Sequence, residues 1–205
     1  IAQLTELLTE LGQPKFRAAQ LFKWLQSGVE TFDEMTNIPI ALREKLRECC
    51  YIADVEIVKR FESKIDGTVK YVFSLYDGEY IESVFMKYKY GNSICVSSQA
   101  GCRMGCKFCA STKEGWVRSL YASEIEGQLH TVEKYSGEKI SNIVYMGIGE
   151  PLDNYDNVVK SIRLINYPLG LNIGARHITV STCGIVPKIK EFTKDFSQVN
   201  LAISL

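Results

Sequence analysis

The chain has 205 residues, of which 46% are hydrophobic and 23% are charged, which is ordinary for a soluble globular protein. No apolar run approaches the roughly 20 residues that a membrane span needs. Residues 1–6 have neither the basic start nor the apolar stretch of a signal peptide. We therefore expect a cytoplasmic protein whose seven cysteines are reduced or metal-bound.

The charges of the chain balance, with 24 Lys and Arg residues against 24 Asp and Glu residues. The net charge thus gives no indication of a nucleic-acid partner. The length suffices for one domain or one and a half. Because the sequence starts without Met and stops inside an expected strand, we expect it to be a piece of a longer protein.

Residues 1–52 are expected to be helical, because apolar residues recur there at helical spacing in three segments. Gly12 with Pro14 should end the first helix, Gly28 should end the second, and Pro39 suits the first turn of the third. The apolar positions are Leu4, Leu7, Leu8 and Leu11, then Ala18, Leu21, Phe22 and Leu25, then Leu42, Leu46 and Cys49. We predict a helical accessory domain over residues 1–52.

Residues 53–90 carry the signals of antiparallel strands. Asp66-Gly67 and Asp77-Gly78 are typical hairpin turns on either side of one strand. Within that strand, Val69, Tyr71, Phe73 and Leu75 alternate onto one face. These patterns predict a β-hairpin extension.

From residue 91 onward, short apolar segments alternate with amphipathic segments. We expect strands at residues 93–97, 140–146, 177–181 and 199–205, and helices at residues 123–135, 155–165 and 186–196. Ser123 and Glu126 predict a capping box at the first of these helices. The repetition favours a parallel sheet with right-handed crossovers, so the predicted fold class is α/β, a partial (β/α) barrel of about four strands over residues 91–205, truncated at its C-terminus.

Three cysteines, Cys102, Cys106 and Cys109, lie in one run with the spacing C-x3-C-x2-C. Thiolates are the usual ligands of iron–sulfur clusters, and three ligands on a four-iron cluster leave one iron open for chemistry. The alternative is a structural zinc site with a fourth ligand such as Cys95. Zinc ligands, however, usually come as two separated pairs.

Polar or glycine-rich segments follow each expected parallel strand. They are the cysteine run, residues 147–152, residues 181–184 and Ser204. Parallel barrels carry their chemistry on the loops after the strand C-termini, so we expect these four strand ends to meet at one rim. Taken singly, the glycines indicate a tight turn, Cys183 a small buried residue, and His130 and His177 structural or solvated side chains.

Residues 93–102, the cysteine run, residues 146–152 and residues 201–205 together resemble the dual-specificity RNA adenine-C2 methyltransferases (RlmN type) of the radical S-adenosylmethionine (SAM) superfamily. The resemblance runs along the whole chain, and it implies that the helical domain of residues 1–52 binds RNA together with the barrel rim. It implies a 4Fe-4S cluster and SAM as cofactors, and methylation of carbon 2 of adenosine 2503 in 23S rRNA and of adenosine 37 in tRNA through a methylcysteine intermediate. It also implies partners: 23S rRNA, tRNA and an electron donor such as flavodoxin or ferredoxin, with no membrane and a monomeric protein.

The resemblance further implies a role for individual residues. Cys102, Cys106 and Cys109 would hold the cluster, Cys95 would be the resolving cysteine, and Glu82 would accept a proton. SAM would contact Gly149, Glu150, Ser181 and Ser204, with Glu150 receiving its ammonium group, and Phe108 would pack beside the cluster and the adenine. The methyl-carrying cysteine lies beyond residue 205 in the family pattern, so we expect that the chain alone cannot complete turnover.

Two other functions stay open at this stage. The adenine-C8 rRNA methyltransferases (Cfr type) share the architecture, although residues 97–100 favour the C2 group. A non-catalytic, metal-stabilised RNA-binding module is the second. Phe16-Arg17 and residues 87–90 are basic and aromatic and could contact RNA, or they could be a solvated face.

Overall fold

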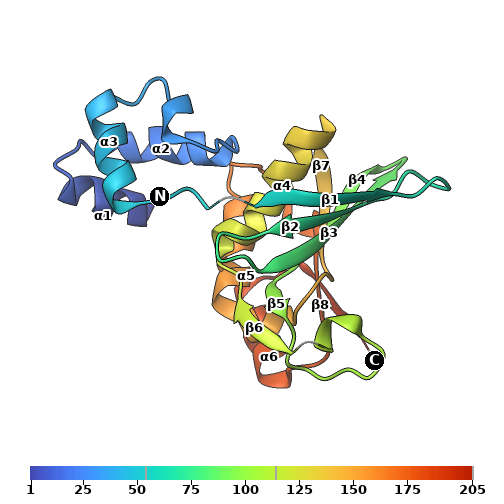
Figure 1. Ribbon diagram of the computed structural model, residues 1–205. Helices are drawn as coiled ribbons and strands as arrows, with labels where there is room; N and C mark the ends of the chain where they lie inside the picture. Colours follow the sequence, from blue (N-terminus) through green and yellow to red (C-terminus); the bar gives the residue numbers. More distant parts are fainter. Residues whose placement is uncertain (54, 114, 205) are drawn as a thin grey trace.

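The computed structural model describes residues 1–53, 55–113 and 115–204. Three N-terminal helices stand beside a large twisted sheet, and three further helices cover one face of that sheet (Figure 1). Two separate sets of buried apolar side chains correspond to these two parts. No helix within the described ranges combines the length and the apolar character that crossing a membrane requires.

The N-terminal part contains α1 (Ala2–Glu10), α2 (Phe16–Gln26), a 3₁₀ turn η1 (Phe32–Glu34) and α3 (Ile40–Cys49). The three helices expected from the apolar spacing are therefore confirmed. Their common core includes the buried residues Leu8, Ala18, Leu21, Met35, Leu42 and Leu46. Pro39 is the cap residue immediately before α3. Cys49 was expected on the buried face of α3, but it is exposed, because it lies in the last turn beyond the core contacts.

The main sheet has seven strands in the order β1-β2-β3-β4-β7-β8-β9. Neighbouring strands from β1 to β4 pair antiparallel, and β4, β7, β8 and β9 pair parallel. The hairpin strands thus extend the same sheet that carries the parallel strands. The division at residues 52 and 90 stays a prediction. The strands are β1 (Glu56–Glu62), β2 (Val69–Ser74), β3 (Tyr80–Tyr88), β4 (Gly91–Cys95), β7 (Ile140–Tyr145), β8 (Ile178–Thr182) and β9 (Asn200–Ile203).

Helices α4 (Ala122–Ser136), α5 (Tyr155–Ile165) and α6 (Val186–Asp195) connect the parallel strands. Each helix buries apolar side chains against the sheet, as Leu129, Ile162 and Phe192 show. The expected alternation of strands and helices after residue 91 is confirmed. Shorter 3₁₀ turns, η3 (Pro151–Asn154) and η4 (Ala175–His177), lie in the connections.

The N-terminus of α4 differs from the expectation. Tyr121 is the cap residue, and its backbone N–H donates to the Glu124 carboxylate at 2.8 Å. The predicted capping box of Ser123 and Glu126 is therefore wrong, because the helix begins earlier than the S-x-x-E spacing indicated. Glu126 is instead buried on α4, facing α2.

A small antiparallel pair that the sequence did not predict flanks the cysteine run. Its strands are β5 (Gln99–Gly101) and β6 (Trp116–Ser119), and a 3₁₀ turn, η2 (Ala110–Thr112), lies between them. Gly101 has a left-handed φ of 71°, and a Cβ there would lie 2.0 Å from the carbonyl oxygen of Gly115. Only glycine allows this approach, which closes the base of the cysteine-bearing loop.

Candidate functional site

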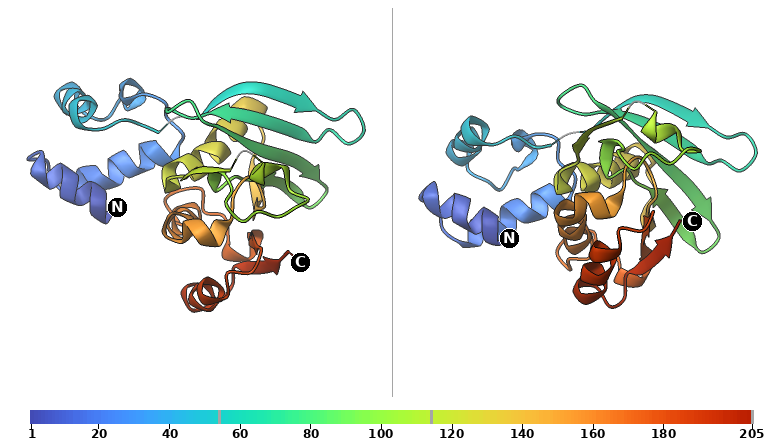
Figure 2. Two further views of the ribbon diagram at one scale, coloured as in Figure 1. Left: turned by 60° about the horizontal axis from the view of Figure 1, so that its bottom comes forward. Right: turned by 90° about the horizontal axis from the view of Figure 1, so that it is seen from below.

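The ends of the parallel strands surround one cavity of about 200 Å³. Both views in Figure 2 show the cysteine-bearing loop near the end of β9. The expectation that four strand ends meet at one rim is confirmed. Eight of the ten candidate residues line the cavity: Cys102, Cys106, Phe108, Cys109, Gly149, Glu150, Ser181 and Ser204. Glu82 and Cys95 are not among its described lining residues.

The cysteine loop is held by its backbone. The Cys102 N–H donates to Gly115 O at 3.0 Å, and the Cys109 N–H donates to Cys106 O at 3.0 Å. The Thr112 hydroxyl donates to the carbonyl of Cys109 at 3.0 Å. Burial raises the pKa of the Cys102 thiol, and the neighbouring thiols of Cys109 and Cys106 raise it further. The three thiols are therefore close enough to interact electrostatically while they line the same cavity.

The thiol set fits a cluster better than a single ion. Among the described residues, no three metal-ligating side chains are arranged to hold one metal ion. A four-iron cluster binds each of three cysteines through a different iron, so its ligands surround a volume rather than a point. Three thiols around one cavity meet that requirement. A zinc site with Cys95 as fourth ligand is not supported, because Cys95 is absent from the described lining of this cavity.

Glu150 presents a buried carboxylate, only 4% exposed, in the loop after β7. Its Oε1 accepts from the Leu152 N–H at 3.0 Å, and its Oε2 accepts from the Cys183 N–H at 2.8 Å. These two bonds compensate the burial of the carboxylate and fix its orientation. Cys183 was expected to be buried, but it is exposed at the cavity. Desolvation and the adjoining Glu150 raise the pKa of its thiol to about 12.

Two glycines let the loop after β7 pack against the chain that follows β4. A Cβ on Gly147 would lie 2.7 Å from the backbone nitrogen of Ser97. Gly149 has a φ of 104°, and a Cβ there would lie 2.6 Å from Cβ of Gln99. The glycines therefore provide close backbone approach as well as a turn. This packing brings Glu150 beside the cysteine loop.

Two hydroxyl groups meet on neighbouring strand ends. Ser181 pairs with Ala202 in the β8–β9 register, and Ser204 lies two residues further along the same face. The Ser181 and Ser204 Oγ atoms are 2.8 Å apart. The structure thus brings together two predicted site residues that are 23 positions apart in sequence.

A buried polar network behind the cavity was not predicted. Gln128 of α4, fully buried, accepts from the Ser83 hydroxyl at 2.7 Å and from the Ser97 N–H at 2.9 Å. Gln99, also fully buried, accepts from the Glu150 N–H at 2.9 Å and donates to Asp153 at 2.8 Å. The network ties the cysteine-bearing segment to the Glu150 loop. The run of polar residues 97–99 directly after an apolar strand was the one available signal.

Glu82 and Cys95 share the sheet face that is turned away from α4–α6. Cys95 pairs with Val84 across the β3–β4 register, and Glu82 lies two residues from Val84 on the same face. Glu82 is half exposed and forms an ion pair with Lys70 at 2.9 Å. Burial raises the pKa of the Cys95 thiol. The same face continues through Val144 and Thr179 toward Ser181, so both residues lie on the sheet face that leads to the cavity.

Comparisons with known proteins agree with this geometry. The family model described as the ribosomal RNA large subunit methyltransferase N-terminal domain matches residues 1–52, and the model of the radical SAM superfamily matches residues 96–205. A probable dual-specificity RNA methyltransferase RlmN of Lachnospira eligens is 53% identical over 204 residues, covering 99% of this chain and 58% of that protein. The corresponding protein of Clostridium novyi is 55% identical, with coverages of 99% and 60%.

A solved structure is also similar. The crystal structure of a radical SAM methyltransferase from Sphaerobacter thermophilus superposes with a TM-score of 0.91 at 38% identity, covering 100% of this chain and 61% of that one. The chain spans about 60% of the length of the curated relatives that it matches. Because the superfamily model covers more than half of the chain and the RlmN relatives align along nearly all of it, the chain belongs to the radical SAM superfamily and, within it, to the RlmN family.

Proposed function

We propose that this chain contributes the N-terminal region and part of the catalytic barrel of a SAM-dependent methyltransferase that acts on carbon 2 of adenine in 23S rRNA and tRNA. The observation that carries the proposal is the cavity of about 200 Å³ in which three cysteines meet the ends of the parallel strands. The relatives named as dual-specificity RNA methyltransferases point to the same substrates.

The cofactors proposed for this site are a 4Fe-4S cluster and SAM, as membership of the superfamily implies. Cys102, Cys106 and Cys109 would hold the cluster. When bound, the cluster supplies the electron for reductive cleavage of SAM. The protein then has to bind, orient and shield the reactants, and the buried position of Cys102 serves this purpose.

The SAM-binding role falls to residues on three loops of the same cavity. Glu150 would accept the ammonium group of SAM, a charge-assisted contact whose geometry is prepared by the two backbone amides on its carboxylate. Gly149 would let the ligand approach the backbone closely, since it has no side chain. Ser181 and Ser204 would contribute hydroxyl groups from adjacent strands.

The proposed catalytic residues lie farther along the sheet. Glu82 would accept the proton from carbon 2, and Cys95 would resolve the covalent adduct. An adenine between the cavity and this face must be unstacked from its RNA neighbours. Phe108, whose side chain is 85% exposed at the cavity, offers a surface for that base.

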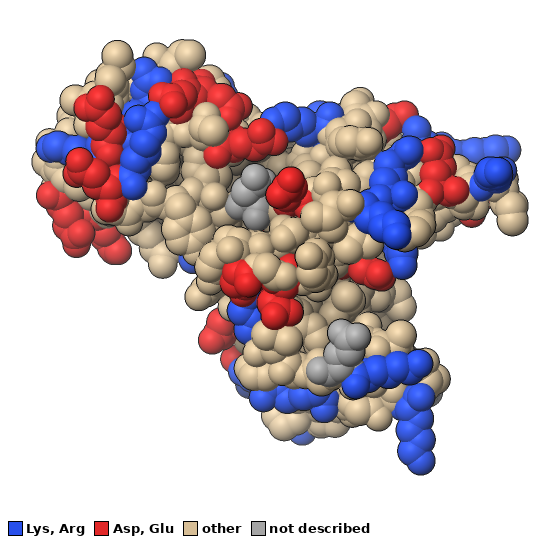
Figure 3. Space-filling model, viewed as in Figure 1, with Lys and Arg blue, Asp and Glu red and all other residues tan. Residues whose placement is uncertain are grey.

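The RNA itself would lie over the sheet extension and the N-terminal helices. On the face drawn in Figure 3, Lys and Arg side chains gather over the β1–β3 end of the molecule, and Asp and Glu are interspersed with Lys and Arg over the helical part. The Tyr88 and Tyr90 rings stack at 5.0 Å, and both are exposed. Cation and aromatic groups together suit a phosphate chain with unstacked bases. The electron donor, the monomeric state and the cytoplasmic location stay predictions.

Electron paramagnetic resonance of the anaerobically reconstituted, reduced chain tests the cofactor site. We expect a 4Fe-4S signal that changes when SAM is added, and we expect Cys106→Ala to abolish it. Cys49→Ala is the matched control, since that exposed cysteine lies in α3. Stoichiometric zinc without a cluster would contradict the proposal.

Mass spectrometry of nucleosides from RNA treated with the full-length protein tests the reaction. 2-Methyladenosine is expected in both rRNA and tRNA. 8-Methyladenosine would assign the C8 reaction instead. RNA binding without any methylated adenosine would favour the non-catalytic module.

A further inference from the structure

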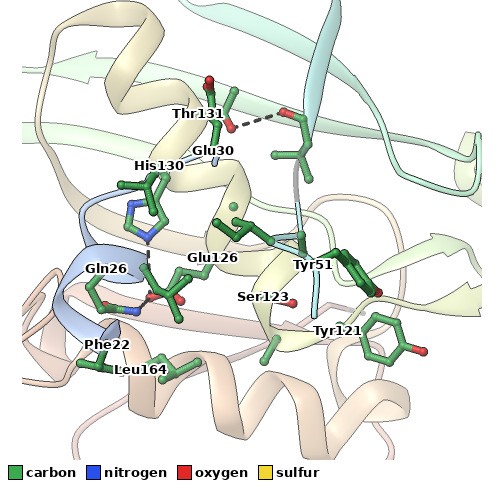
Figure 4. A pocket seen from close by; sticks show the side chains of 18 of the residues that line it. Phe22, Gln26, Glu30, Tyr51, Tyr121, Ser123, Glu126, His130, Thr131 and Leu164 are labelled. Atoms are coloured by element: carbon green, nitrogen blue, oxygen red, sulfur yellow. Dashed lines mark hydrogen bonds and ion pairs between the residues drawn. The ribbon is translucent and has the colours of Figure 1, made fainter. Parts of the chain in front are cut away.

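A second cavity, of about 500 Å³, lies between the N-terminal helices and the barrel, and it shares no described lining residue with the cavity at the cysteine loop. Its walls come from α1, α2 and the following connection on one side, and from α4 and α5 on the other. Figure 4 shows the side chains that line it. Most ligand cavities fall in the range of about 300–1,000 Å³, so its size admits a small organic group.

The deep end of this cavity holds a polar cluster formed by Gln26, Glu126 and His130 (Figure 4). Glu126 is 7% exposed, and its Oε1 accepts from Gln26 Nε2 at 2.8 Å. His130 Nε2 lies 3.9 Å from the same Oε1 and has no hydrogen-bond partner in the described part of the chain. No described residue donates to Glu126 Oε2 either. Three polar atoms of the cluster therefore have no partner among the described residues: His130 Nε2, Glu126 Oε2 and Gln26 Oε1, the last of which lies against Gly170.

The cluster is not an ion pair near neutral pH. Burial raises the pKa of Glu126 to about 7, although the hydrogen bond from Gln26 opposes this change. Burial also lowers the pKa of His130 to about 4, so its imidazole is neutral. With its ring proton on Nδ1, a neutral His130 accepts at Nε2, and an ionised Glu126 accepts at both carboxylate oxygens. A ligand that donates two adjacent N–H groups would satisfy His130 Nε2 and Glu126 Oε2 in this tautomer.

The rest of the cavity is apolar inside and mixed at the mouth. Phe22, Leu25 and Leu164 are among the apolar lining residues. Tyr51 and Tyr121 are 63% and 51% exposed, and Figure 4 places them together at the end opposite His130. Among the described residues, the other charged groups that line the cavity are Lys160 from α5, Lys134 from α4 and Glu30, which pairs with Lys134 at 2.6 Å.

We propose that this cavity binds one unstacked guanine base of the RNA, with Glu126 and His130 accepting hydrogen bonds from its N1–H and N2–H groups. This inference rests on the proposed RNA substrate. Guanine is the RNA base that presents two adjacent donors on its pairing edge, which matches the two acceptors. The apolar walls receive the faces of the base, the two tyrosines at the mouth stack on its neighbour, and Lys160 lies within reach of a phosphate.

The proposal predicts the direction of pH dependence. A guanine edge binds the ionised form of Glu126, and ionisation of that group is completed above pH 7. Affinity should therefore rise about tenfold between pH 6 and pH 8, as the ionised fraction of a group with a pKa near 7 does. Adenine would require protonated Glu126, and its affinity would fall over the same range.

Isothermal titration calorimetry with the four nucleoside 5′-monophosphates tests the proposal directly. We expect guanosine monophosphate to bind more tightly than the other three, and Glu126→Gln to weaken it at least tenfold at pH 8. Glu138→Gln, at an exposed carboxylate paired with Lys87, is the matched control and should leave binding unchanged. Ser123→Phe, which places a ring at the cavity wall, should also block binding.

Three results would overturn the inference: no binding of guanosine monophosphate at millimolar concentration, equal binding of all four nucleotides, or binding that Glu126→Gln leaves intact. These measurements need neither a bound 4Fe-4S cluster nor the methylation reaction. Failure of this site is thus distinguishable from failure of the proposed reaction, which the nucleoside analysis measures independently.

Discussion

Replacing Glu126 with glutamine should stabilise the chain at pH 8 far more than at pH 5. The carboxyl group is buried on α4 against α2, and burial raises its pKa from 4.5 to about 7. A carboxyl whose pKa is raised by folding favours the folded state below pH 4.5, and that contribution is lost as the pH rises through about 7. Glutamine has nearly the same shape, keeps an acceptor for Gln26 and carries no charge.

The magnitude follows from the two pKa values. Each tenfold change in a protonation constant is worth about 1.4 kcal/mol. The raised pKa of Glu126 in the folded state then lowers the free energy of unfolding by about 3 kcal/mol at pH 8 and by less than about 1 kcal/mol at pH 5. The difference in unfolding free energy between the variant and the parent chain should therefore be roughly 2 kcal/mol more in favour of the variant at pH 8 than at pH 5.

Urea unfolding of both proteins at pH 5 and pH 8 measures this difference, because the midpoint and slope give the free energy of unfolding. His130 and the other titrating groups are common to both chains and cancel in the comparison. Glu138→Gln is the control. Its stability relative to the parent chain should change with pH in the opposite direction, since Lys87 lowers the pKa of Glu138. A stability difference that does not change with pH, or a variant less stable at pH 8, would refute the reasoning.

Two further substitutions test the local geometry. Gly101→Ala should lower the iron and sulfide bound after reconstitution, because its Cβ would lie 2.0 Å from a backbone oxygen. Gly78→Ala has a similar left-handed φ in open space, so equal losses in both variants would argue against the steric account. Arg118→Met should destabilise the chain by about 3 kcal/mol in urea unfolding at pH 7, because it leaves the buried carboxylate of Glu124 without its ion pair. Arg163→Met, at an exposed ion pair, should cost less than about 1 kcal/mol, and a comparable loss in both would contradict the role of burial.

The spacing of apolar residues along the sequence predicted most of the helices and strands. The alternation of Val69, Tyr71, Phe73 and Leu75 predicted a strand with one buried face, and all four side chains are buried. The segments expected to be parallel strands and helices after residue 91 all form. The start of α4 was misplaced because Ser123 and Glu126 match the capping spacing as well as Tyr121 and Glu124 do. Local spacing alone does not choose between two overlapping helix starts.

The residues behind the cavity could not be predicted in the same way. Gln128 is buried only because α4 packs against β3 and against the segment that follows β4, where Ser83 and Ser97 need partners. These contacts join residues 45 and 31 positions apart. A buried amide and an exposed amide on a helix have the same sequence signal, and tertiary packing decides between them.

The local features of this protein could be read from its amino-acid sequence: the apolar periods of its helices and strands, the cysteine spacing, and the polar or glycine-rich segments after each parallel strand. Which of these features meet in space depends on the packing of the folded chain. Strand register placed Ser181 beside Ser204, and the loop packing at Gly147 and Gly149 held Glu150 near the cysteines. The docking of α2 on α4 buried Glu126 and raised its pKa. Local patterns follow from backbone geometry within a few residues, whereas burial and convergence depend on contacts between distant segments.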